Sequence, residues 1–133
     1  MNIEKRLELI KRNTEEIIGE EELKKLLKKK KPVIYWGTAP TGRPHIAYFF
    51  PALKIADLLK AGFHVKILLA DLHAALDKTP WHVLEHRYDY YEKAIPEMIK
   101  AIGVNINELE IIKGSDFQLK PEYMHDVLRM SSI

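Results

Sequence analysis

The feature that most constrains this chain is an apolar run followed by a glycine- and proline-bearing turn and then a helical pattern. Residues 33–36 are apolar and rich in β-formers, which predicts a buried strand. Residues 37–44 contain two glycines and two prolines, which predicts a loop. From 45 to 61 apolar residues recur with helical spacing, and Gly62 supplies a C-terminal stop. This order of elements is typical of a parallel α/β fold.

The same pattern continues along the chain. Residues 65–70 form a near-continuous apolar run, which predicts a parallel strand covered on both faces. Residues 81–102 predict a long helix that ends at Gly103. Pro96 is expected to kink that helix or to mark a break in it. Residues 109–113 predict a third strand.

Helices are predicted at both ends of the chain. The spacing of the apolar residues near the N-terminus predicts two short helices, the second following Gly19. Lysines at 28–31 place cations at the end of the second helix, where the helix dipole favours them, and Pro32 stops it. We interpret these lysines as a solvated face, with an RNA-contacting patch as the alternative. A last helix is expected over 121–130.

Together these elements predict a Rossmann-like β-α-β-α-β half with a parallel sheet and an N-terminal helical hairpin. The 133 residues, of which 47% are hydrophobic, suit a single domain. Within it we expect a helical preface over 1–31 and a nucleotide-binding half over 32–133. The sequence has no cysteine and no apolar run of membrane-spanning length, which indicates a cytoplasmic protein without a membrane partner. A net charge of +2 does not by itself indicate nucleic-acid binding.

The turn between the first strand and the first helix is suited to phosphate binding. Gly37 and Gly42 let the backbone approach a ligand closely, and the helix that begins near His45 presents unpaired N–H groups to an anion. A P-loop is excluded because no Lys-Ser/Thr pair follows Gly42, and the Gly-x-Gly-x-x-Gly dinucleotide motif is absent. His45 remains as a donor to a phosphate oxygen that gains charge during group transfer.

The segment 44–48, Pro-His-Ile-Ala-Tyr, resembles the HIGH signature of class I aminoacyl-tRNA synthetases, at the position where that family has it. Ala47 replaces glycine and Tyr48 replaces the second histidine. This form, with the preceding Gly-Thr-Ala-x-Thr-Gly-x-Pro, is similar to tyrosyl-tRNA synthetases of the archaeal and eukaryotic type. Further blocks at 68–74, 114–119 and 129–132 are also similar to that family, so the resemblance spans the N-terminal part of its catalytic domain.

The resemblance implies roles for particular residues. Tyr35 is similar to the tyrosine that hydrogen-bonds the substrate hydroxyl. Such a contact supports discrimination of up to ~10⁵ against phenylalanine, a value that was itself established for a tyrosine-activating enzyme. The implied tyrosine-binding residues are Tyr35, Leu68, Ala70, His73, Phe117 and Gln118. The implied ATP-binding residues are Gly37, Thr38, Gly42, His45, Ala47 and Tyr48, with His45 as the catalytic residue.

Several of these residues have ordinary structural interpretations. His73 is as well explained as a buried structural histidine as by a pocket wall. Asp71 either caps a turn or contacts ligand, and the sequence does not decide between them. His82 and His86 share a helix face, but no third ligand is evident and no protein-bound metal is predicted. The aromatic cluster at 81–91 is interpreted as packing rather than as a base-stacking platform.

The resemblance implies ATP-dependent activation of L-tyrosine to tyrosyl-adenylate for transfer to tRNA(Tyr), with Mg²⁺ accompanying ATP. The second family signature, KMSKS, and an anticodon-binding domain are absent from the sequence. We therefore expect a truncated or minimal catalytic fragment, with a noncatalytic interaction module or a split-enzyme piece as the alternative. A tryptophan-activating relative is a third interpretation, which Tyr35 opposes. Apolar surface left open by truncation predicts self-association or a complementary fragment.

Overall fold

The computed structural model describes residues 1–28 and 31–132, so Lys29 and Lys30 of the predicted lysine run lie outside the described residues. The N-terminal elements are α1 (Ile3–Lys11), α2 (Glu20–Lys28) and β1 (Val33–Thr38). The central elements are η1 (Ile46–Tyr48), α3 (Phe49–Lys60), β2 (His64–Leu69), α4 (Asp71–Leu76) and α5 (Trp81–Ala101). The C-terminal elements are β3 (Leu109–Lys113), α6 (Ser115–Gln118) and α7 (Pro121–Ser131).

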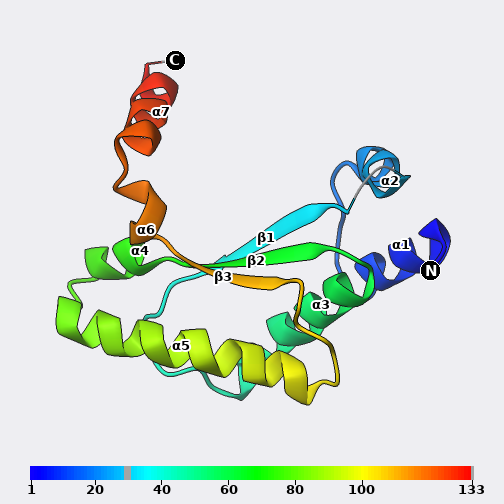
Figure 1. Ribbon diagram of the computed structural model, residues 1–133, viewed down its shortest axis with the longest axis horizontal. Coiled ribbons are helices and arrows are strands. Elements are labelled where there is room, and N and C mark those ends of the chain that lie inside the picture. Colours follow the sequence, from blue (N-terminus) through cyan, green and yellow to red (C-terminus); the bar gives the residue numbers. More distant parts are fainter. Residues whose placement is uncertain (29–30, 133) are drawn as a thin grey trace.

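The strands form a parallel sheet in the order β1-β2-β3, as the sequence predicts for a Rossmann-like half. Trp36 pairs with Ile67 and Ile67 with Ile111 in the register of the sheet. Helices α3 and α5 pack together below the sheet, while α2 and the α6–α7 segment rise above its opposite ends (Figure 1). No helix in the described part of the chain has the length and apolar character needed to cross a membrane.

The prediction that the second strand is covered on both faces was wrong. Burial alternates along β2: Val65, Ile67 and Leu69 are fully buried, whereas His64, Lys66 and Leu68 are only half-buried. Successive right-handed crossovers between neighbouring strands in one direction place both connecting helices on the same face. The described residues therefore leave the other face of the sheet open. The sequence did not predict this, because residues 65–70 are mainly apolar.

The beginning of the predicted helix over 45–61 also differs. The chain makes a 3₁₀ turn over η1 before α3 begins at Phe49, and β1 extends to Thr38 instead of ending at 36. Pro51 fits the first turn of α3, where a backbone N–H has no helical partner. Ile46 and Phe50 are 81% and 76% exposed, although the spacing placed both in the apolar stripe.

Two further differences concern helices. Helix α5 runs through Pro96 without a break, so the interruption that the proline suggested does not occur. The short helices α4 and α6 follow directly after β2 and β3, and the sequence patterns did not predict them because each is shorter than two helical repeats. The predicted helices near both termini are confirmed by α1, α2 and α7.

The N-terminal hairpin is fastened to α3 by charged side chains. Arg12 forms a two-pronged ion pair with Asp57, whose side chain is buried in α3. Lys54, also in α3, donates to the backbone carbonyls of Ile10 and Arg12. Arg6 donates to the carbonyl of Ala61 at 2.6 Å. The Lys54 contacts satisfy carbonyls at the end of α1, and the Arg6 contact satisfies one at the end of α3, where the last carbonyls have no helical partners.

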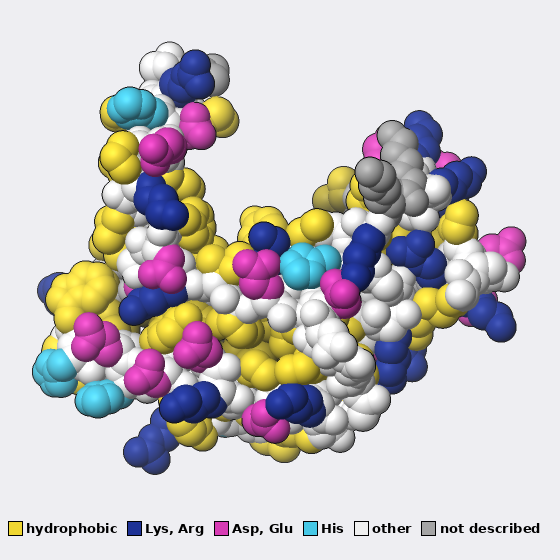
Figure 2. Space-filling view, in the orientation of Figure 1, with side chains coloured by type: hydrophobic (Ala, Val, Ile, Leu, Met, Phe, Trp, Pro, Cys, Tyr) yellow, Lys and Arg dark blue, Asp and Glu magenta, His cyan; other side chains and the backbone are white. Residues whose placement is uncertain are grey.

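The far end of the chain is open to solvent. Every residue of α7 is exposed, and α7 extends away from the sheet (Figure 1). Figure 2 shows the hollow between this arm and the α2 end, with charged and histidine side chains gathered on the strands at its floor. Among them His64 lies between Glu108 and Glu110, at 3.2 and 3.1 Å. The pKa of each glutamate is lowered, that of Glu108 first by hydrogen bonding to Lys31 and that of Glu110 first by hydrogen bonding to His64.

Candidate active site

Two backbone hydrogen bonds hold the carboxyl ends of the three strands together. The N–H of Ala70, just after β2, donates to the carbonyl of Thr38 at 2.9 Å. The N–H of Gly114, just after β3, donates to the carbonyl of Leu69 at 3.0 Å. These two bonds hold the loops that follow the strands side by side. In parallel α/β sheets this edge is where ligands bind.

His45 lies at the start of the helical segment that follows β1, as predicted. It adopts an extended backbone conformation and caps η1, with its Nδ1 atom accepting from the N–H of Ala47 at 3.4 Å. That contact fixes the side of the ring that faces the protein. The Nε2 atom has no hydrogen-bond partner among the described residues, and the side chain is exposed. The imidazole can therefore present Nε2 to a phosphate at the helix N-terminus.

A chain of hydroxyl groups connects this turn to α5. The hydroxyl of Tyr48 lies 2.9 Å from that of Tyr91 and 3.4 Å from that of Thr38. Tyr48 also meets His45 and Tyr91 edge to face. Burial, followed by the hydrogen bond to Tyr48, raises the pKa of Tyr91 far above its usual value, so this hydroxyl stays protonated. The hydroxyl of Tyr48 is therefore bonded within the protein, and its ring packs against that of His45.

Two of the predicted tyrosine-binding residues lie on the open face of the sheet. Tyr35 points outward from β1 and is 74% exposed. Leu68 lies on the same face of β2, directly beside Gly37 in the register. A Cβ atom added to Gly37 would contact the Leu68 side chain at 3.9 Å. The missing side chain at Gly37 therefore keeps open the space between Tyr35 and the strand end.

Asp71 proves to be a structural cap. Its carboxylate is buried, and its Oδ1 atom accepts from the N–H of Ser115 at 2.9 Å, which ties the start of α6 to the end of β2. Gly114 is required for this approach, because a Cβ there would lie 2.8 Å from Asp71 Oδ1 and 2.7 Å from Gln118 Oε1. Of the two interpretations that the sequence left open, the structure supports the turn cap.

The remaining predicted tyrosine-binding residues follow the second and third strands. Phe117 and Gln118 lie in α6 and both contact Tyr123 of α7, through an edge-to-face ring pair at 5.4 Å and a 3.4 Å hydrogen bond. His73 lies in α4, at the same end of the sheet as α6 (Figure 1), and its side chain is exposed rather than buried. The structural-histidine interpretation is therefore wrong on the point of burial.

Sequence reasoning missed Tyr91, which it grouped with packing aromatics. The side chain is 1% exposed and packs in the core, yet its hydroxyl reaches the phosphate turn. The sequence offered no signal for this contact, because Tyr48 and Tyr91 are 43 positions apart. Among residues 1–28 and 31–132 no cluster of three His, Cys, Asp or Glu side chains is arranged to hold a metal ion.

The parallel sheet, the glycine turn after its first strand and the histidine at the following helix are the features of an α/β fold of the class I synthetase type. Residues 27–133 match the family model described as tRNA synthetases class I (W and Y). The chain belongs to this family.

Two curated relatives show the similarity to this family in detail. The chain is 53% identical over 132 residues to a cytoplasmic tyrosine–tRNA ligase of Danio rerio, covering 98% of the chain and 25% of that protein. It is 46% identical to the cytoplasmic tyrosine–tRNA ligase of Saccharomyces cerevisiae, covering 94% of the chain and 33% of that protein. The chain thus spans between a quarter and a third of the length of these two relatives.

Solved structures agree with this assignment. The fold matches tyrosyl-tRNA synthetase from Archaeoglobus fulgidus, solved in complex with L-tyrosine, with a TM-score of 0.88 and 38% identity. That match covers 100% of this chain and 41% of the other. The enzyme from Pyrococcus horikoshii, also in complex with L-tyrosine, matches with a TM-score of 0.86 and 27% identity. The predicted family and the Rossmann-like fold class are therefore confirmed.

Proposed function

We propose that this chain forms the nucleotide-binding half of a site that activates L-tyrosine with ATP, for transfer of the tyrosyl group to tRNA(Tyr). The observation that carries the proposal is the geometry of the turn after β1: His45 lies at a helix start, its Nδ1 atom is bonded to Ala47, and its Nε2 atom has no partner among the described residues. The relatives named tyrosine–tRNA ligase support the proposal, and the word cytoplasmic in their names supports a cytoplasmic protein.

In the proposed reaction a carboxylate oxygen of tyrosine attacks the α-phosphorus of ATP, which enters with Mg²⁺. The bond from that phosphorus to the bridging oxygen breaks, and pyrophosphate leaves with the electron pair. No side-chain nucleophile takes part, so the protein contributes position and charge stabilisation. Gly37, Thr38, Gly42 and Ala47 line the turn as backbone partners for phosphate, while His45 donates to an oxygen that gains negative charge.

For tyrosine itself we propose a binding position on the open sheet face, next to the loops that follow the strands. Tyr35 is placed to bond the phenolic hydroxyl, and Leu68 and Ala70 supply apolar wall. His73, Phe117 and Gln118 complete the set from α4 and α6. Gln118 already bonds the hydroxyl of Tyr123, so α7 helps to orient it.

ATP–pyrophosphate exchange on the 133-residue chain, tested with each of the twenty amino acids, checks this proposal. We expect exchange with tyrosine and none with tryptophan, because Tyr35 offers a partner to a phenolic hydroxyl. Exchange with tryptophan instead would contradict the assignment. Silence with all twenty would favour the noncatalytic interaction module, which the complete exposure of α7 also favours. Self-association, or pairing with a complementary fragment, stays a prediction.

Replacing Tyr35 by phenylalanine is expected to weaken tyrosine binding by up to ~10-fold, the usual effect of one neutral hydrogen bond. Phenylalanine binding should not change, because that ligand has no hydroxyl to lose. Calorimetric titration with both amino acids measures the difference. Tyr90→Phe removes another exposed tyrosine hydroxyl, from α5, and serves as the matched control. An equal loss for both ligands would remove Tyr35 from hydroxyl recognition.

A further inference from the structure

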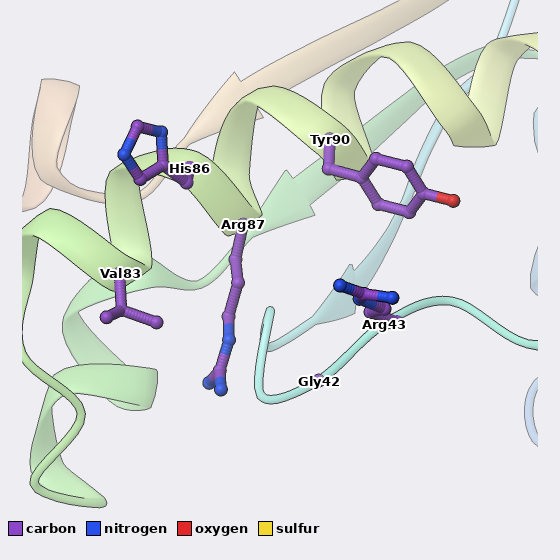
Figure 3. Close-up of a pocket in the computed structure, with 6 residues that line it drawn as sticks. All are labelled: Gly42, Arg43, Val83, His86, Arg87 and Tyr90. Atoms are coloured by element: carbon purple, nitrogen blue, oxygen red, sulfur yellow. The ribbon is translucent and has the colours of Figure 1, made fainter.

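A second pocket, of about 530 Å³, lies between α5 and the outer side of the turn at Gly42. Its lining residues are Gly42, Arg43, Val83, His86, Arg87 and Tyr90. Figure 3 shows Arg87 extending from α5 past the Gly42 turn, while Arg43 lies below the ring of Tyr90. The imidazole of His86 points away from the turn in this view, so the charged groups near the turn are the guanidinium of Arg87 from α5 and that of Arg43 from the loop itself.

The charge of this pocket is unbalanced. None of its lining residues is acidic. Neither Arg43 nor Arg87 forms an ion pair with any residue in the part of the chain that the structure describes, whereas Arg12 and Arg129 do. Two like charges that line one pocket repel each other, and an anion bound between them offsets that repulsion. Guanidiniums fit phosphate oxygens in a two-pronged geometry, so phosphate is the matching anion.

The pocket adjoins the glycine turn, because Gly42 is one of its lining residues. Arg87 is half-buried in α5, which limits the freedom of its side chain, and Arg43 follows Gly42 in the loop. The volume is well above that of a single phosphate and within the range of ligand pockets.

We propose that this pocket binds the polyphosphate group of a small molecule, held between Arg43 and Arg87. The inference goes beyond tyrosine activation and does not require it, because neither arginine belongs to the residues assigned to ATP or tyrosine. The same chemistry is offered by free pyrophosphate and by the phosphate chain of a nucleotide. Tyr90 borders the pocket and is half-exposed, so a nucleotide ring has an aromatic neighbour that free pyrophosphate does not use.

Calorimetric titration of the 133-residue chain with pyrophosphate, with ATP and with a short single-stranded RNA tests the proposal. We expect pyrophosphate to bind, and Arg43→Gln and Arg87→Gln each to weaken binding by about 10-fold, the effect of losing a charge-assisted hydrogen bond. Lys93→Gln removes an exposed cation from α5 outside the pocket and should change little. Tighter binding of ATP, lost in part in Tyr90→Ala, would identify a nucleotide as the source.

A second measurement separates binding from a structural role. Without anion, the Arg43→Gln, Arg87→Gln double variant should melt at the same temperature as the parent chain or higher, because a repulsion is relieved. Pyrophosphate should raise the melting temperature of the parent but not of the variant. Pyrophosphate binding should persist in His45→Ala, because His45 belongs to the proposed ATP site and does not line this pocket. Loss of binding in His45→Ala, a destabilised double variant, or RNA binding that far exceeds pyrophosphate would each overturn the proposal.

Discussion

Replacing His45 by alanine is expected to lower tyrosyl-adenylate formation by ~10²–10³-fold, the usual cost of removing one donor that stabilises developing charge. The side chain is exposed and its only described hydrogen bond is the 3.4 Å contact with Ala47, so the fold should lose little. ATP–pyrophosphate exchange gives the rate, and circular dichroism during heating gives the stability. Both are measured on the same preparation.

The controls for this experiment are available in the chain. His82 is an exposed histidine in the first turn of α5, so His82→Ala should leave exchange unchanged. His45→Gln retains a hydrogen-bond donor and should recover part of the lost rate. Equal exchange in the parent and His45→Ala proteins would end the catalytic assignment. A loss that accompanies unfolding would instead assign His45 to the cap of η1.

The second large effect is expected at Tyr91. Truncation to alanine empties a fully buried ring position and should lower the free energy of unfolding by about 3–5 kcal/mol, the range for large aromatic side chains. Tyr91→Phe keeps the ring and removes only the hydroxyl that bonds Tyr48, which should cost about 1 kcal/mol. Urea denaturation followed by circular dichroism gives both values.

The two Tyr91 variants also separate packing from site geometry. If the hydroxyl chain positions the phosphate turn, Tyr91→Phe should weaken ATP binding more than its small stability loss explains. Ile99→Ala provides the control, since Ile99 is equally buried in α5 but has no hydroxyl to bond Tyr48. A Tyr91→Phe protein with unchanged ATP affinity would reduce the Tyr48–Tyr91 contact to core packing.

The sequence predicted the order of the main elements because each has a clear local cause. The apolar runs produced β1, β2 and β3, and the positive φ of Gly62 and Gly103 ends α3 and α5 as glycine stops do. The turn predicted to bind phosphate also lies where expected, between β1 and the helical segment that follows it, with His45 as the N-cap of η1. Local rules sufficed because neighbouring residues determine these features.

The failures arose where distant residues decide. The open face of β2 follows from the handedness of two crossovers, and Tyr91 gains its role from Tyr48, which is 43 positions away. Arg43 and Arg87 line one pocket only after folding, so their spacing in the sequence carried no signal. Pro96 did not break α5 although local propensity disfavours proline inside a helix, because tertiary packing of Tyr91, Ile95 and Ile99 holds that helix in place.

The strand order has a consequence for how the chain acquires its structure. Each strand pairs with the one made immediately before it, since β2 joins β1 and β3 joins β2. During synthesis every new strand therefore finds its neighbour already emerged, and no pairing has to wait for a distant segment. The sheet can therefore grow one strand at a time in the order of translation. Once residue 113 has emerged, β3 is an edge strand of the sheet.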